Sequence, residues 1–213
     1  MFSLKHFYYF LIFLSFITLF KNRKRLPAYC VWLMALLPLS LFTQIIEEVM
    51  QNYNINSYYL FHIYTYIDGA FVFLLYYNVF KTSLIKKISL ASFCIYSFAV
   101  FYYFYNNKNA LGEKHFLDFT VECFMICFLV ILLYIQMLQV NYKIELRYYT
   151  IFWLNAVHLI FYGGIIFVMG CYYYINQTNH ELAEKFMKIN HFLNLFQYTG
   201  YTTIFICTAV PRT

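Results

Sequence analysis

Three polar side chains lie inside a largely apolar stretch, residues 56–80, and their types are those that bind ligands or hold protons. His62, Thr65 and Asp68 follow one another at helical spacing, with Gly69 beside the last of them. At about 100° per residue they fall within an arc of about 120°, so a helix would carry them as one polar stripe. An ionisable group at membrane depth is costly unless it faces protein or water. The stripe is therefore a candidate functional face.

The composition predicts the class of protein that carries this stripe. Of the 213 residues, 63% are hydrophobic, 24% are aromatic and only 11% are charged, and the mean hydropathy is +0.60. A soluble domain carries about 25% charged residues. We therefore expect an all-α, polytopic membrane protein embedded in a lipid bilayer. The net charge of +6 is explained by loop charges that set the topology, so no nucleic-acid partner is expected.

Seven apolar segments have the length that a bilayer core of about 30 Å requires. They predict transmembrane helices at residues 2–20, 28–50, 56–80, 88–106, 115–140, 148–175 and 190–210. The charged run 180–185 is expected to form a short helical turn on the surface. No soluble domain or linker is left over, which predicts a single seven-transmembrane-helix bundle over residues 1–213.

Basic residues are concentrated in alternate predicted loops, and this distribution predicts the orientation of the helices in the membrane. The first predicted inner loop contains the basic block 21–25. The later inner segments contain Lys81, Lys86 and Lys87, then Lys143 and Arg147, and finally Arg212. Because cytoplasmic loops are enriched in Lys and Arg, the N-terminus is predicted outside and the C-terminus in the cytoplasm. The expected location is the cell membrane, as a multi-pass protein, with the bacterial inner membrane favoured.

Further polar side chains lie in the outer halves of the predicted helices and would open toward the same side. Asp118 and Glu122 are one turn apart and share a face, with Gln136 further along that face. We therefore predict an outward-opening, water-accessible or ligand-filled pocket. Its predicted lining consists of Glu47, Glu48, His62, Asp68, Asp118, Glu122, His158, His191, Asn194 and Gln197.

Structural roles compete with this pocket at several positions. Glu47 and Glu48 are also typical of a helix end at the membrane interface, and acids such as Asp118 suit a positive helix N-terminus. For His158 an interhelical hydrogen bond that holds the bundle together is the favoured interpretation. Asp68 is the deepest acid, and its expected partner is His158 or His191, unless its own carboxyl group is protonated.

No cofactor or metal is expected, and an enzyme is less expected than a binding protein. The six cysteines lie in apolar segments without metal-ligand spacing. Zinc hydrolases of the alkaline ceramidase and adiponectin-receptor kind would need a His-x-x-x-His pair in the last helix, where only His191 is present. A retinal protein would need a lysine there, and residues 192–210 contain none.

Two short segments carry a resemblance. The run from Phe152-Trp153-Leu154 to Tyr162-Gly163-Gly164, together with Tyr64-Thr65-Tyr66-Ile67-Asp68, resembles short uncharacterised seven-helix bacterial proteins that are often encoded beside sensor histidine kinases. Where that resemblance leads us to expect a glutamate, this chain has Asp68. The resemblance implies signalling by association and no known reaction.

The favoured function is therefore an integral membrane sensor or regulatory component that acts through a membrane or cytoplasmic partner protein at its basic inner loops. Asp68→Asn is expected to abolish the response while leaving insertion and folding intact. Two alternatives stay open: a homo-oligomeric pore or membrane effector of a bacterial defence system, and an intramembrane lipid-modifying enzyme or small transporter. A sensor pocket should close beneath Asp68 and His158, whereas a pore needs a continuous polar path.

Overall fold

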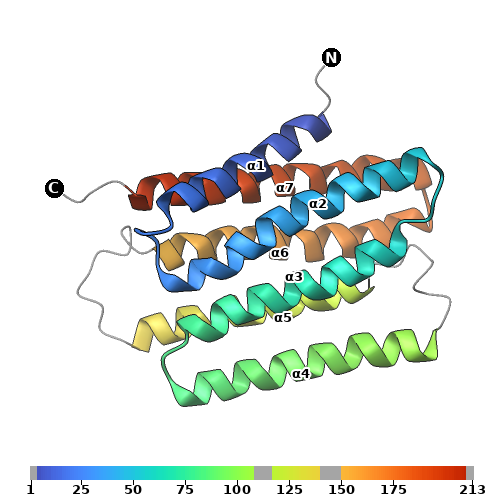
Figure 1. Ribbon diagram of the computed structural model, residues 1–213. Coiled ribbons are helices and arrows are strands. Elements are labelled where there is room, and N and C mark those ends of the chain that lie inside the picture. Colours follow the sequence, from blue (N-terminus) through green and yellow to red (C-terminus); the bar gives the residue numbers. More distant parts are fainter. Residues whose placement is uncertain (1–3, 108–116, 140–149, 210–213) are drawn as a thin grey trace. The chain divides into compact units, whose positions relative to one another are not determined.

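The computed structural model describes residues 4–107, 117–139 and 150–209, and within these ranges the chain consists of helices joined by short turns, with no strand. The helices are α1 (Leu4–Asn22), α2 (Val31–Asn52), α3 (Tyr58–Val79), α4 (Ser83–Asn106), α5 (Leu117–Gln139), α6 (Thr150–Asn176) and α7 (His180–Ala209) (Figure 1). A 3-10 turn, Ala28–Cys30, precedes α2. The predicted all-α class is confirmed. Lys143, Arg147 and Arg212, on which part of the predicted topology depends, lie outside the described residues.

Among the described residues, five helices are long and apolar enough to cross a membrane. They are α2 with its preceding turn, α3, α4, α5 and α6, each between 22 and 27 residues long. Helices of this length span the hydrocarbon core of about 30 Å. The chain is thus a multi-pass membrane protein. The structure does not include α1 and α7 in this group, and seven spans and the orientation of the termini stay predictions.

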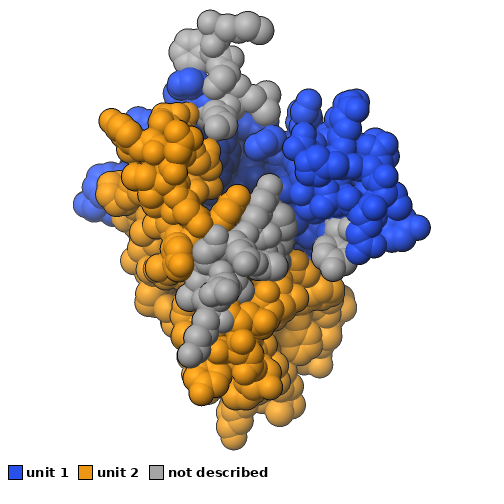
Figure 2. Space-filling view, turned by 90° about the vertical axis from the view of Figure 1, so that its right-hand side faces the viewer, with its two compact units in different colours: residues 1–28, 141–213 blue, residues 29–140 orange. Residues whose placement is uncertain are grey.

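The helices belong to two compact units, which Figure 2 colours separately. Unit 1 comprises residues 1–28 and 141–213 and contains α1, α6 and α7, and unit 2 comprises residues 29–140 and contains α2 to α5. The single seven-helix bundle stays a prediction.

In unit 2, α3 is the central helix. It packs against α2, α4 and α5, and α4 also packs against α5. The buried side chains of α3 recur every three or four residues, as one face of a helix requires: His62, Thr65, Gly69, Val72, Phe73, Leu75 and Tyr76. The predicted polar stripe therefore faces the interior of unit 2, with Asp68 half-buried at its edge.

In unit 1, α6 and α7 form an antiparallel hairpin, and α1 packs along α7 (Figure 1). Small residues let the two hairpin helices approach closely. A Cβ on Gly200 would lie 2.7 Å from Val157 Cγ2, and one on Gly164 would lie 2.8 Å from Leu193 Cδ2. Such close backbone approach is typical of helix packing in membranes, where dispersion contacts replace the hydrophobic driving force.

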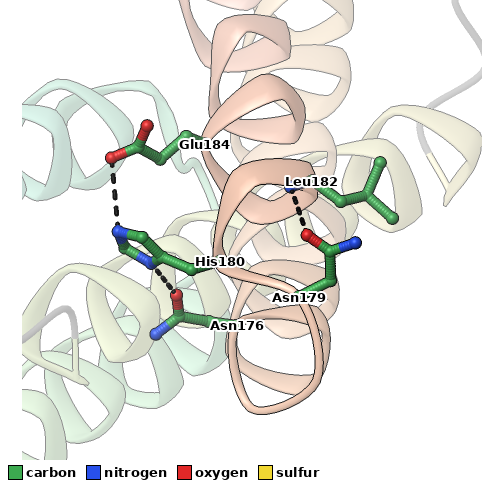
Figure 3. Close-up of polar contacts among 5 residues, drawn as sticks. All are labelled: Asn176, Asn179, His180, Leu182 and Glu184. Carbon is green, nitrogen blue, oxygen red and sulfur yellow. Dashed lines mark hydrogen bonds and ion pairs between the residues drawn. The ribbon is translucent and has the colours of Figure 1, made fainter.

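Helix α7 begins well before the predicted residue 190, and the charged run 180–185 forms its first turns. The reason is local capping at the hairpin turn, shown in Figure 3: Asn179 Oδ1 accepts a hydrogen bond from the backbone N–H of Leu182 at 3.0 Å. His180 then lies between Asn176 Oδ1 at 2.6 Å and Glu184 Oε1 at 3.4 Å. The other boundary that differs clearly is that of α4, which begins at Ser83 instead of residue 88.

Candidate functional site

The packing of α3, α4 and α5 brings ionisable side chains together inside unit 2. We call this group the acidic cluster, and it consists of His62 and Asp68 on α3, Tyr96 on α4, and Asp118 and Glu122 on α5. The two α5 acids lie one helical turn apart, so both face α3. The structure thus joins four of the ten predicted pocket residues.

His62 and Asp118 form the best-defined pair of the cluster. His62 Nδ1 lies 2.8 Å from Asp118 Oδ2, and each residue is only 3% exposed. The rings of Phe61 and Phe104 stand edge-on to the imidazole, with centroids 5.5 and 5.1 Å away. The second carboxyl oxygen of Asp118 is also buried, and no hydrogen-bond partner for it exists among the described residues. The pair therefore satisfies only one of the two carboxyl oxygens.

Glu122 is the most enclosed acid of the cluster. It is 0% exposed, and no donor group of the described residues reaches either of its carboxyl oxygens. The neighbouring group within hydrogen-bonding reach is another carboxyl, that of Asp68. Asp68 and Asp118 are near enough to interact with it electrostatically. Since a buried carboxylate is costly unless it is paired or hydrogen-bonded, this arrangement requires a further positive species or a proton.

Gly69 and Tyr96 pack closely together with Glu122 in the acidic cluster. A Cβ on Gly69 would lie 3.1 Å from Glu122 Cγ and 3.2 Å from the Tyr96 hydroxyl oxygen. That hydroxyl is buried, and it too has no hydrogen-bond partner among the described residues. Tyr96 is a member of the cluster that was not predicted, because nothing in the sequence distinguishes it among 24 tyrosines.

Asp68 forms the edge of the cluster. It is half-buried, and the Tyr64 hydroxyl lies 3.4 Å from Asp68 Oδ1, one turn away on the same helix. Its carboxyl group is a neighbour of the buried Glu122 carboxyl. His158 and His191, the partners expected for Asp68, belong to unit 1, so that pairing stays a prediction.

Glu47 and Glu48 are half-buried on α2, in the same unit. Gln51 Nε2 lies 3.2 Å from Glu47 Oε1, one turn along that helix. Such an arrangement is compatible with the interfacial role expected for the end of a helix, and their membership of the pocket stays a prediction.

The other four predicted pocket residues belong to unit 1. His158 Nε2 lies 2.7 Å from the Tyr201 hydroxyl, to which Gln197 Nε2 donates at 2.9 Å. The predicted interhelical hydrogen bond of His158 is therefore confirmed, and it joins α6 to α7. Asn194 is half-buried and donates to the Asn190 carbonyl at 2.8 Å, whereas His191 is exposed. A single pocket that includes both sets stays a prediction.

Neither metal binding nor disulfide formation is indicated for the described residues. Among them, no group of three or more His, Cys, Asp and Glu side chains is arranged to hold a metal ion. The six cysteines are free thiols, and they divide between buried positions such as Cys123 and exposed ones such as Cys94. What the acidic cluster can do chemically is take up and release protons or hold a cation.

A scan against models of protein families and searches among curated proteins and solved structures find no match for this chain. The physical character of the acidic cluster is therefore the basis for a functional proposal.

Proposed function

We propose that this protein is an integral membrane sensor or regulatory component, that the acidic cluster receives its ligand, and that a partner protein reads the response. The observation that carries the proposal is Glu122, a fully buried acid whose carboxyl oxygens are reached by no donor group of the described residues. Unsatisfied buried polar groups are rare in folded proteins and need an explanation. A site that takes up a positively charged ligand would explain why the Glu122 carboxyl group is buried in this way.

Helix α5 supports a structural connection between the acidic cluster and the basic segment 81–87. Asp118 and Glu122 lie near its beginning and Gln136 near its end, roughly 20 Å further along at about 1.5 Å per residue. Gln136 is buried, and its Oε1 accepts hydrogen bonds from the backbone N–H groups of Lys81 at 2.8 Å and Thr82 at 3.5 Å. A shift of α5 would therefore move the connection between α3 and α4.

The connection between α3 and α4 leads into a basic segment, as expected of a surface that binds a partner protein. It is followed by Lys86 and Lys87, so that three lysines lie within the residues 81–87. The positive-inside rule predicts this segment on the cytoplasmic side, where an acidic surface of a partner could bind it. The resemblance to proteins encoded beside sensor kinases points to the same kind of role.

Hydrogen–deuterium exchange of the full chain in lipid nanodiscs tests this structural connection. Glu122→Gln removes the capacity for charge at nearly constant shape, and we expect a change in amide exchange over residues 81–87. Glu184→Gln, which alters an acid that is exposed and lies in unit 1, should leave those residues unchanged. Identical exchange in all three proteins would contradict the proposed structural connection.

The alternative of a homo-oligomeric pore has its own test. A sensor reconstituted in liposomes should not release an entrapped fluorescent dye or dissipate a potassium gradient. Flux that depends on the protein and disappears in Glu122→Gln would replace the sensor by a channel or transporter.

A further inference from the structure

We infer that the ligand of the acidic cluster is the proton, held between Glu122 and Asp68, so that the protein responds to pH. This inference rests on the proposed function, whose ligand site it specifies. Geometry and charge support it separately.

The space in the cluster fits a proton better than an organic ligand. Glu122 is 0% exposed, Tyr96 is 2% exposed, and His62 and Asp118 are each 3% exposed. On the α3 side, a single carbon atom added at Gly69 would already lie within 3.1 to 3.3 Å of Glu122 and Tyr96, tighter than nearly all ordinary contacts. Close packing of this kind leaves no room there for a ligand with several heavy atoms.

The charges around Glu122 favour the same ligand. Asp68 neighbours it from α3, Tyr96 from α4, and Asp118 together with the thiol of Cys123 from α5. His62, the imidazole of this group, is engaged by Asp118 at 2.8 Å. Carboxyl groups that share a poorly solvated site cannot all be ionised at once, and they titrate as a coupled set.

Asp68 provides the entry for the proton. It is the half-buried member of the cluster and the neighbour of Glu122, and its Oδ1 lies 3.4 Å from the Tyr64 hydroxyl. In the transfer step, the Asp68 carboxylic acid gives its proton to the Glu122 carboxylate, so that Asp68 becomes a carboxylate and Glu122 a carboxylic acid.

Infrared spectroscopy of the full chain in lipid nanodiscs tests the inference directly. We expect a carboxylic-acid C=O band from a buried, protonated side chain that persists at pH values at which exposed carboxyl groups are ionised. The band should be lost in Glu122→Gln, shifted in Asp68→Asn, and unchanged in Glu184→Gln. Should Glu122→Gln fail to fold, the shift in Asp68→Asn still assigns the band to this pair.

Two results would overturn the inference. One is the absence of any protonated-carboxyl band in the folded wild-type protein across the mildly acidic and neutral range. The other is loss of the band on replacing choline chloride by sodium chloride at constant pH, which would make a metal cation the ligand.

Exchange over residues 81–87, measured at the same pH values, separates this inference from the proposed function. A band that titrates while the segment is insensitive to pH would retain the proton site and contradict the sensor. The opposite result is that exchange over residues 81–87 responds to Glu122→Gln but not to pH, and that no protonated-carboxyl band is found. This result would retain the sensor and contradict the proton as its ligand.

Discussion

Gly69 stands where α3 comes closest to Glu122 and Tyr96, and the missing Cβ lets both side chains reach the same point of the helix. A glycine in a helix interior normally costs about 1 kcal/mol relative to alanine. At residue 69 this cost is accompanied by a close approach of the two helices, which brings Asp118 and Glu122 of α5 against the polar stripe of α3. At the scale of the residue, the geometry of the cluster therefore depends on a side chain that is absent.

Gly69→Ala should destabilise the protein despite the better helix propensity of alanine. Overpacking of a tight site costs about 1–3 kcal/mol, and the gain in propensity offsets about 1 kcal/mol of it. Gly170→Ala is the matched control, because a Cβ there meets nothing within 4 Å. Thermal unfolding in detergent should show a lower Tm for the first variant and an equal or higher Tm for the second. Equal Tm values for Gly69→Ala and the wild type would contradict the close contact.

At the scale of the element, α5 is a rod with the acidic cluster near its first turns and Gln136 near its last. Both groups lie on its buried face, as the shared face predicted for Asp118, Glu122 and Gln136 requires. Coupling between the two ends needs only that α5 moves as a rigid body, which is the ordinary behaviour of a packed helix.

Gln136→Leu should release the segment that follows α3. The backbone N–H groups of Lys81 and Thr82 lose their acceptor, which removes a net contribution of about 0.5–1.5 kcal/mol for a hydrogen bond of this kind. We expect faster amide exchange over residues 81–87, and no added effect when Glu122→Gln is combined with it. Gln139→Leu, at an exposed position of the same helix, is the control and should leave this segment as in the wild type. Additive effects of the two substitutions would show that α5 does not connect the sites.

In unit 1 a polar contact joins α1 to α7. Ser15 Oγ lies 2.8 Å from Thr202 Oγ1 and donates to the Tyr198 carbonyl at 2.9 Å, in a buried position. A double-mutant cycle with Ser15→Ala and Thr202→Val should give a coupling energy of about 0.5–1.5 kcal/mol, measured by unfolding in detergent. Thr203→Val is the control, because Thr203 is exposed and its hydroxyl bonds only to its own helix at Thr199. A coupling energy near zero would remove this contact from the interface.

At the scale of the whole molecule, the orientation in the membrane is open to a chemical test. The 30 residues of α7 extend to about 45 Å, longer than a bilayer core of about 30 Å, so its charged first turns would lie outside the hydrocarbon if α7 spans the membrane as predicted. With the predicted orientation, a membrane-impermeant amine reagent should label Lys185 and Lys188 in intact cells. Lys81, Lys86 and Lys87 should be labelled only after permeabilisation. Mass spectrometry of the labelled peptides reads out both sets, and the inverse pattern would reverse the topology.

Periodicity is what made the helical faces predictable. His62, Thr65 and Gly69 on α3 and Asp118 with Glu122 on α5 were placed on buried faces because side chains three or four residues apart share a face wherever the helix packs. The start of α7 was missed, because the run 180–185 is mostly charged and too short to show a helical period by itself, and its helix begins at the cap formed by Asn179.

The amino-acid sequence by itself determined the all-α class, the apolar spans and the residues that share a helical face, since these follow from composition and from local periodicity. Only the tertiary structure decided which faces meet. It paired His62 with Asp118 and His158 with Tyr201, and it brought Tyr96 to Glu122 beside Gly69. The physical reason is that helix partners are selected by shape at the packed interface, where one missing Cβ decides how close two helices come, and no local pattern records that fit.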